Sequence, residues 1–137
     1  MICVRNAAVQ DTPLSIAATG IIVPFDTVVK NTNKNCNLIN NTIAVGVTGT
    51  YDTNCQLTLE NGGTSAVMVS LQVYADGKAV DGAEATTSIA ASSTAQLNFE
   101  WPVTIKTAQN GLANISWFIS GGAVTLSNAV ATMYKYV

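Results

Sequence analysis

Residues able to carry catalysis are few in this chain. None of its 137 residues is histidine, the commonest general base and a frequent metal ligand. The eight acidic residues could supply the carboxylate pair of a glycosidase only if two of them faced one cleft. However, Asp52 and Glu100 occupy polar positions of alternating segments, and Glu60 and Asp76 adjoin turns. We therefore expect solvated carboxylates.

The motifs of common enzyme classes are also missing. The chain has no GxSxG elbow for a serine nucleophile, no P-loop and no GxGxxG fingerprint. Asn- and Asp-rich loops offer oxygens of the kind that Ca²⁺ prefers, but no EF-hand-like spacing supports a calcium site. The sequence therefore predicts a protein that is not an enzyme and that holds no cofactor and no metal.

Three cysteines, Cys3, Cys36 and Cys55, could bind zinc or form a disulfide. Zinc is disfavoured, because the chain has neither a CxxC pair nor a histidine. A Cys36–Cys55 bridge stays open, and so does the alternative that all three are reduced and pack as small apolar side chains. The start, Met1 to Arg5, lacks the pattern of a signal peptide. We expect synthesis and folding in a cytoplasm.

The composition limits the partners. Hydrophobic residues make up 48% of the chain and charged residues 10%, whereas about 25% charged is usual. The apolar runs are far shorter than the roughly 20 residues needed to span a membrane. The six basic residues are scattered singly along the sequence, which predicts binding to neither nucleic acid nor a membrane. A neutral polar surface is typical of a protein whose surface is largely covered by partners. The alternative is that the low charge has no functional meaning.

Alternation with a period of two dominates the chain and indicates β-strands. In the segment 51–60, odd positions such as Tyr51 and Leu57 share one face and polar residues share the other. Asp76-Gly77 is typical of a two-residue hairpin turn, and Asn110-Gly111 predicts another turn. Pro102 lies inside an alternating run, so we expect an edge strand or a bulge there.

The spacing of strands and turns predicts an all-β fold, a jelly-roll β-sandwich of about 8–10 antiparallel strands. The segment 31–41 is Asn-rich and lacks periodicity, so it is interpreted as a loop. Residues 1–18 alternate poorly. We therefore predict an N-terminal arm at 1–18 outside a jelly-roll domain at 19–137.

Six segments form a characteristic order along the chain. They are Val23 to Val29, Ile43-Ala44-Val45, Gly49-Thr50-Tyr51 running into Asp52 to Leu59, Val67 to Tyr74 with Asp76-Gly77-Lys78, Gly121 to Leu126, and Ala129 to Val137. Taken in this order, they resemble the trimeric jelly rolls of the complement globular head and tumour necrosis factor group, which has bacterial and phage relatives. The resemblance covers about residues 20–137. Bacteriophage head-fibre and capsid decoration proteins resemble the chain most, because they too are short and rich in Thr, Ala and Val.

The resemblance implies a homotrimer closed around an aromatic-lined axis. Tyr134 and Tyr136 alternate with Ala131 and Met133, so both faces of the last strand look covered. Tyrosine suits such an axis, because its large apolar body carries a hydroxyl that can bond at the rim. The candidates for the trimer interface are Tyr51, Phe118, Tyr134 and Tyr136. The alternative is that these rings fill the core or lie singly on the surface.

The predicted arm is a candidate for docking onto a capsid or another virion protein. Ile2-Cys3-Val4 could add a strand to the edge of a partner's sheet, unless the terminus is disordered. The function expected is that of a structural virion protein, a head-fibre or capsid decoration trimer at the virion surface, with weak adhesion to glycans left open. The alternatives are a receptor- or carbohydrate-binding tip and a bacterial spore-coat or cell-surface jelly roll.

Overall fold

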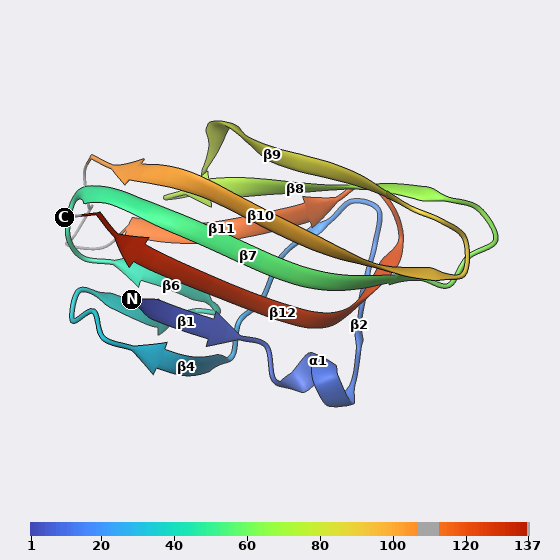
Figure 1. Cartoon of the computed structure of the whole chain (residues 1–137), viewed down its shortest axis with the longest axis horizontal. Coiled ribbons are helices and arrows are strands. Elements are labelled where there is room, and N and C mark those ends of the chain that lie inside the picture. The colour runs from blue at the N-terminus through green and yellow to red at the C-terminus, as the bar shows by residue number, and fades with distance from the viewer. Residues whose placement is uncertain (107–112, 137) are drawn as a thin grey trace.

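Two antiparallel sheets of six strands each pack face to face in the computed structural model, which describes residues 1–106 and 113–136 (Figure 1). In the first sheet the order is β10 (Ser93–Ile105), β7 (Gly49–Asn61), β12 (Val124–Lys135), β1 (Ile2–Arg5) and β4 (Thr27–Asn31), and β2 (Leu14–Ile16) pairs with β12. In the second it is β5 (Cys36–Ile39), β6 (Thr42–Val45), β11 (Ala113–Ser120), β8 (Val67–Ala75) and β9 (Lys78–Ile89), and β3 (Ile21–Ile22) pairs with β11. The predicted all-β sandwich is confirmed.

The core lies between the two sheets and is built by alternation. In β7 the odd positions from Tyr51 to Leu59 are buried and the even positions face outward. The largest buried ring, that of Trp117 on β11, meets Phe25 edge to face, with 5.8 Å between centroids. Edge-to-face packing suits the ring quadrupoles. One apolar cluster joins both sheets, so the described chain forms a single domain.

Two turn and edge predictions from the sequence are confirmed. Asp76 and Gly77 join β8 to β9 with φ values of 51° and 78°, and positive φ at both positions is what the tightest hairpin turn requires. Pro102 lies on β10, the edge strand of the first sheet, which is where a residue without an N–H is tolerated within a sheet. The turn predicted at Asn110-Gly111 lies outside the described residues.

The prediction of an arm at residues 1–18 is wrong. β1 lies inside the first sheet between β12 and β4, and the side chains of Ile2 and Val4 are fully buried. The short helix α1 (Ala8–Asp11) follows, and β2 pairs with the start of β12. Strands of three or four residues contain too little alternation to stand out in the sequence, although their inward side chains belong to the core.

The sequence predicts a loop over 31–41, but Asn31 ends β4, and residues 36–41 form the first strand and the turn of a β-hairpin that continues to Val45. β5 and β6 pair in register across Asn40 and Asn41, which have φ values of 51° and 65°. Asparagine enters the left-handed region more readily than other non-glycine residues, because its short amide bonds locally. The two asparagines therefore make the turn.

In the described part of the chain no helix is long and apolar enough to cross a membrane.

Candidate interaction surfaces

Tyr51 is not available to a partner, which corrects its assignment to a trimer interface. Its side chain is fully buried between the sheets, and its hydroxyl donates to the Val47 carbonyl at 2.6 Å. The phenol pKa is raised by burial and, to a smaller extent, by nearby Cys36. The sequence alternation had already placed Tyr51 on the same face as Leu57. Its role is core packing.

The other three candidate rings do not lie on one surface. Tyr134, on β12, and Tyr136, just beyond it, are 50% and 53% exposed, and the backbone of Tyr136 bonds to Thr50 of β7 in the first sheet. Phe118 lies on β11 in the second sheet, half-buried, with its ring 6.0 Å from Tyr74 edge to face. Only the two tyrosines therefore remain together as an exposed aromatic pair.

The outer face of the first sheet, turned away from the core, is polar and mostly uncharged. Tyr134 pairs with Asp52, and Thr132 pairs with Asn54. The face is formed by the outward side chains of three strands: Thr50, Asp52, Asn54, Gln56 and Thr58 on β7, Gln96, Asn98, Glu100 and Pro102 on β10, and Val130, Thr132 and Tyr134 on β12. Amides and hydroxyls on this face can exchange hydrogen bonds with a second surface of the same kind.

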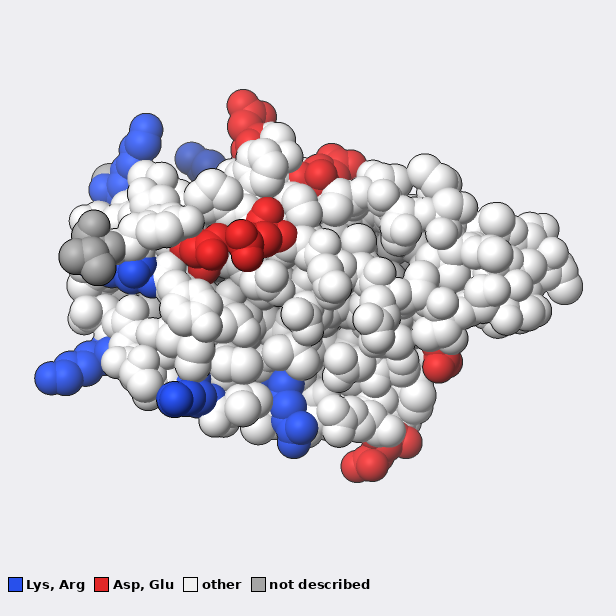
Figure 2. Space-filling view, viewed as in Figure 1, with Lys and Arg blue, Asp and Glu red and all other residues white. Residues whose placement is uncertain are grey.

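Three carboxylates, those of Asp52, Glu60 and Glu100, interrupt this neutral face, and Asp52 and Glu100 lie close enough to interact. Burial raises the pKa of Asp52, and the charge of nearby Glu100 raises it further. Like charges disfavour each other's ionisation, so the pair resists being covered while both groups are charged. Figure 2 shows acidic side chains gathered to the left of the centre of the view, over the region of β7 and β10.

Ile2, Cys3 and Val4 cannot add a strand to a partner, which corrects the docking assignment. β1 already pairs on both sides, with Thr132 opposite Cys3 on β12 and Lys30 opposite Cys3 on β4. Ile2 and Val4 face the core, whereas Cys3 faces outward and is partly exposed. The free edge of the first sheet next to β1 is therefore β4, where Val28 and Val29 are 41% and 57% exposed.

All three cysteines are free thiols, so the option of a Cys36–Cys55 disulfide is not realised. Cys55 lies in the core and Cys36 is buried at the start of β5, and burial raises the pKa of both thiols. A thiol with a raised pKa stays protonated and behaves as a small apolar group. Cys36 and Cys55 therefore offer no reactive site, and Cys3 is the one cysteine that a reagent can reach.

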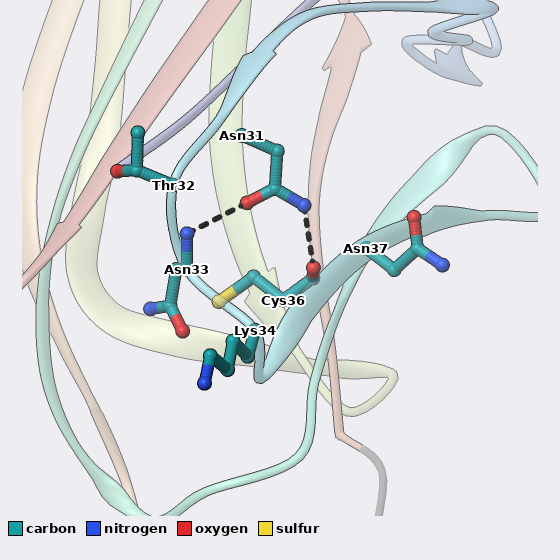
Figure 3. Close-up of a pocket in the computed structure, with 6 residues that line it drawn as sticks. All are labelled: Asn31, Thr32, Asn33, Lys34, Cys36 and Asn37. Atoms are coloured by element: carbon teal, nitrogen blue, oxygen red, sulfur yellow. Dashed lines mark hydrogen bonds between the residues drawn. The ribbon is translucent and has the colours of Figure 1, made fainter.

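An open hollow of about 320 Å³ lies at the turn from β4 into β5 (Figure 3). It is lined by Asn31, Thr32, Asn33, Lys34, Cys36 and Asn37. Asn31 shapes it, because its amide donates to the Cys36 carbonyl at 2.8 Å and accepts from the Asn33 N–H at 3.0 Å. The Cys36 sulfur points between Asn33 and Lys34. The lining is polar, with one positive charge.

A second cluster of hydrogen bonds ties two loops together at the opposite end of the sandwich. The buried amide of Asn61 donates to the carbonyls of Ser65, Ile89 and Ala90 at 2.9 to 3.2 Å. Its oxygen accepts from the Gly63 N–H at 3.0 Å. One side chain thus joins the β7–β8 loop to the β9–β10 loop and makes a fixed, uncharged tip, which we call the Asn61 tip.

No protein-family model and no curated protein matches the sequence. Solved structures do match the fold along nearly the whole chain. The globular domain of zebrafish complement 1qA protein has a TM-score of 0.58 at 12% identity, with 99% of this chain and 96% of that chain covered. Eiger TNF from S. frugiperda has a TM-score of 0.61 at 11% identity, with 99% and 92% covered.

The fold is that of the complement and TNF jelly rolls. The PRD1 vertex protein P5 shares it, with a TM-score of 0.58 and 15% identity over 99% of this chain and 72% of that chain. Identities this low establish the shared fold alone. The resemblance seen in the sequence from residue 20 onward is therefore confirmed as a fold relationship, and the jelly roll extends over the N-terminal residues as well.

Sequence reasoning missed one feature of this jelly roll. The basic residues, scattered singly along the chain, gather in the half of the molecule that contains both ends of the chain, while the opposite tip is free of charge in this view (Figure 2). Lys78 beside a recognised turn and Lys135 at a strand end were the available signals. The topology of the sheets decides which strands end at the same end of the sandwich. Local sequence patterns do not reveal that topology.

Proposed function

We propose that the chain is a non-enzymatic structural protein of a phage virion, a head-fibre or capsid decoration homotrimer made in the host cytoplasm and displayed on the particle surface. The observation that carries the proposal is the match of the whole chain, end to end, to a fold that the PRD1 vertex protein P5 shares. A surface with few charges supports the same role, because it suits a module covered by copies of itself and by a shell.

The trimer rests on the resemblance to the complement and TNF group and on the exposed aromatic pair. Tyr134 and Tyr136 offer apolar area on a sheet face that is otherwise built of amides and hydroxyls. Rings that lie half-exposed on one copy are buried when a second copy covers the face, and tyrosine is enriched in such interfaces. We place the contact between copies on the outer face of the first sheet. Phe118 is left out of this contact, because it lies on the other sheet.

Light scattering on the purified protein at micromolar concentration tests the assembly. We expect three times the 14.2 kDa chain mass. Placing aspartate at both Tyr134 and Tyr136 should reduce the mass to that of one chain, because charge buried without a partner is costly. The matched control, Thr64→Asp with Met68→Asp, adds the same charge at exposed positions outside that face and should stay assembled. A monomeric wild-type protein would rule out the trimer.

The virion role has its own test. Antibody labelling of gradient-purified particles in electron micrographs should place the protein on the outer surface. β1 is enclosed in the sheet, so Ile2→Ala should lower the stability of the folded protein. It should not produce a folded trimer that fails to attach to the particle. Purified particles without the protein would overturn the assignment, whatever its oligomeric state.

A further inference from the structure

All five lysines lie at one end of the sandwich, which we call the lysine end. Lys30 is the penultimate residue of β4, and Lys34 follows in the loop to β5. Lys78 begins β9, Lys106 directly follows β10, and Lys135 ends β12. The sequence spacing between them runs to more than a hundred residues, so only the fold brings them to the same end.

The strand registers establish this placement. In the first sheet the end of β10 lies opposite Gly49, the first residue of β7, and Lys135 lies opposite Tyr51. On the other side of the same sheet, Asn31 at the end of β4 lies opposite Ile2. The strand ends that carry Lys30, Lys106 and Lys135 therefore coincide.

The second sheet ends at the same place. Val45 of β6 pairs with both Cys36 and Ala113, the first residues of β5 and β11. Farther along this sheet, Ala75 pairs with Lys78. The backbone N–H of Gly46 donates to Asn35 at 2.7 Å, which joins the β6 end to the loop that holds Lys34.

Acidic groups at this end are fewer than the lysines. Asp76 lies in the β8–β9 turn, Asp81 lies three residues beyond Lys78, and Asp52 and Glu100 lie a short way along β7 and β10. The chain as a whole has a net charge of −2. The five ammonium groups outnumber these acids, so this end carries a small positive surplus in a chain whose net charge is negative. An anion should therefore be attracted here more than to the rest of the surface.

We propose that the lysine end binds an acidic polysaccharide. The ammonium groups come from five different places on both sheets, so they do not converge on one small anion, and repeated charges along a polymer match them better. The open hollow beside Lys34 adds neutral polar groups. In the described part of the chain, the side-chain N–H groups of Asn33 and Asn37 donate to no protein atom, and their oxygens accept from the backbone at 2.9 Å. Free amide donors suit sugar hydroxyls and carboxylates.

The same details disfavour a nucleic acid. The hollow beside Lys34 contains no aromatic ring on which a base could stack, and stacking supplies much of the affinity for single strands. Tyr134 and Tyr136 flank Lys135 at this end, but both belong to the face that we assign to the contact between copies. No arginine lies among the five charges, although its planar fork is the usual partner of phosphate. The inference goes beyond the proposed structural role, because one chain can bind in this way without a trimer and without a shell.

Binding of the purified full-length protein to immobilised polygalacturonate tests the proposal, with neutral dextran and an oligothymidylate of equal charge as comparison probes. We expect binding to polygalacturonate at about 0.01 M salt and loss at about 1 M salt, since the screening length falls from roughly 30 Å to 3 Å. Dextran should not bind, and the oligothymidylate should bind more weakly. Absence of binding to polygalacturonate at low salt would overturn the proposal, as would equal or tighter binding of the oligothymidylate.

Two double variants locate the surface. Lys30→Gln with Lys34→Gln, and Lys78→Gln with Lys106→Gln, should each weaken binding about fivefold at low salt, as expected for the loss of two exposed charges. The matched control, Thr64→Asp with Ser92→Asp, shifts the net charge by the same amount at the Asn61 tip and should bind like the wild type. Exposed lysines tolerate glutamine, and circular dichroism checks the fold. Equal weakening in the control would show that net charge, not the lysine end, governs binding.

Discussion

At the scale of single residues, Asp26 holds the N-terminal segment against the first sheet. Its carboxylate accepts from the N–H groups of Ala7 and Ala8 at 2.8 and 3.2 Å and from the Thr27 hydroxyl at 2.7 Å. These bonds, led by that of Ala7, lower the pKa of Asp26 below its ordinary value. A side-chain acceptor at the start of a helical turn is a capping interaction, here supplied by the residue that directly precedes β4.

Replacing Asp26 with asparagine should lower the free energy of unfolding at neutral pH by about 1 kcal/mol, a typical loss for a cap at an exposed site. Because the folded-state pKa is lowered, the stabilisation is present above the ordinary value of 3.8 and is lost as the pH falls through the folded-state pKa. Urea titrations of wild type and variant at pH 7 and pH 3 measure this. A difference that does not shrink at pH 3 would contradict the ionic origin.

Asp52 should show the opposite pH dependence. Its pKa is raised by burial and by Glu100, so the folded state favours the protonated acid, and stability falls as the pH rises through the window just above 3.8. Asp52→Asn should therefore raise the melting temperature at pH 7 and leave it nearly unchanged at pH 3. Asn98→Asp, a new carboxylate on the same outer face, should lower it at pH 7 and serves as the reverse control. A destabilised Asp52→Asn protein at pH 7 would refute this reading.

At the scale of elements, one buried amide fixes the far ends of two hairpins. Asn61 ends β7, and its four hydrogen bonds reach both the loop that leads to β8 and the turn before β10. Neighbouring Gly62 and Gly63 leave the loop little side-chain packing of its own. The order of the tip therefore depends on the polar side chain and not on apolar burial.

Asn61→Ala should cost about 2 to 3 kcal/mol, because it leaves carbonyls without their donor in a buried place. Asn114→Ala, at an exposed position of β11 in the second sheet, should change stability by less than about 0.5 kcal/mol. Chemical denaturation measures the two costs, and hydrogen exchange should show faster opening of both loops in Asn61→Ala alone. Unchanged protection in the β9–β10 turn would mean that the amide does not join the loops.

The elements that the sequence predicted well are the long ones. The alternation of β7, β8 and β10 spans many residues, and Asp76-Gly77 readily takes the positive φ values of a two-residue hairpin turn. Local sequence patterns are therefore enough to predict these elements. β1 and β5 have four residues each, too few for a pattern, and they are strands because longer neighbours pair with them. Tyr51 shows the same at a single residue: its position in the alternation predicts burial, its amphipathic ring suits an interface, and in the structure the alternation decides.

At the scale of the whole molecule, one core includes side chains from the first strand to the last. Ile2 and Val4 contact the same apolar cluster as Ala131 and Met133, and Trp117 lies fully buried within it. The candidate surfaces depend on this closure, since the lysine end exists only when distant strand ends meet. Global pairing of this kind is what the sequence patterns could not supply.

A single core predicts a single unfolding transition. Tryptophan fluorescence and far-ultraviolet circular dichroism should give coincident urea curves at any one protein concentration, because the core and all the strands are lost together. A probe placed on the outward Cys3 should follow the same curve. An earlier, separate transition at Cys3 would mean that residues 1–18 open independently of the rest.

The Asn61 tip and the two ends of the chain lie at opposite poles of the long axis. A foreign peptide inserted next to Thr64, an exposed loop residue, would therefore stand clear of any resin, tag or fusion partner joined through either terminus. The protein could be immobilised through one pole and carry the inserted peptide at the other. The hydrogen bonds of Asn61 would hold the loop that carries the insertion in place.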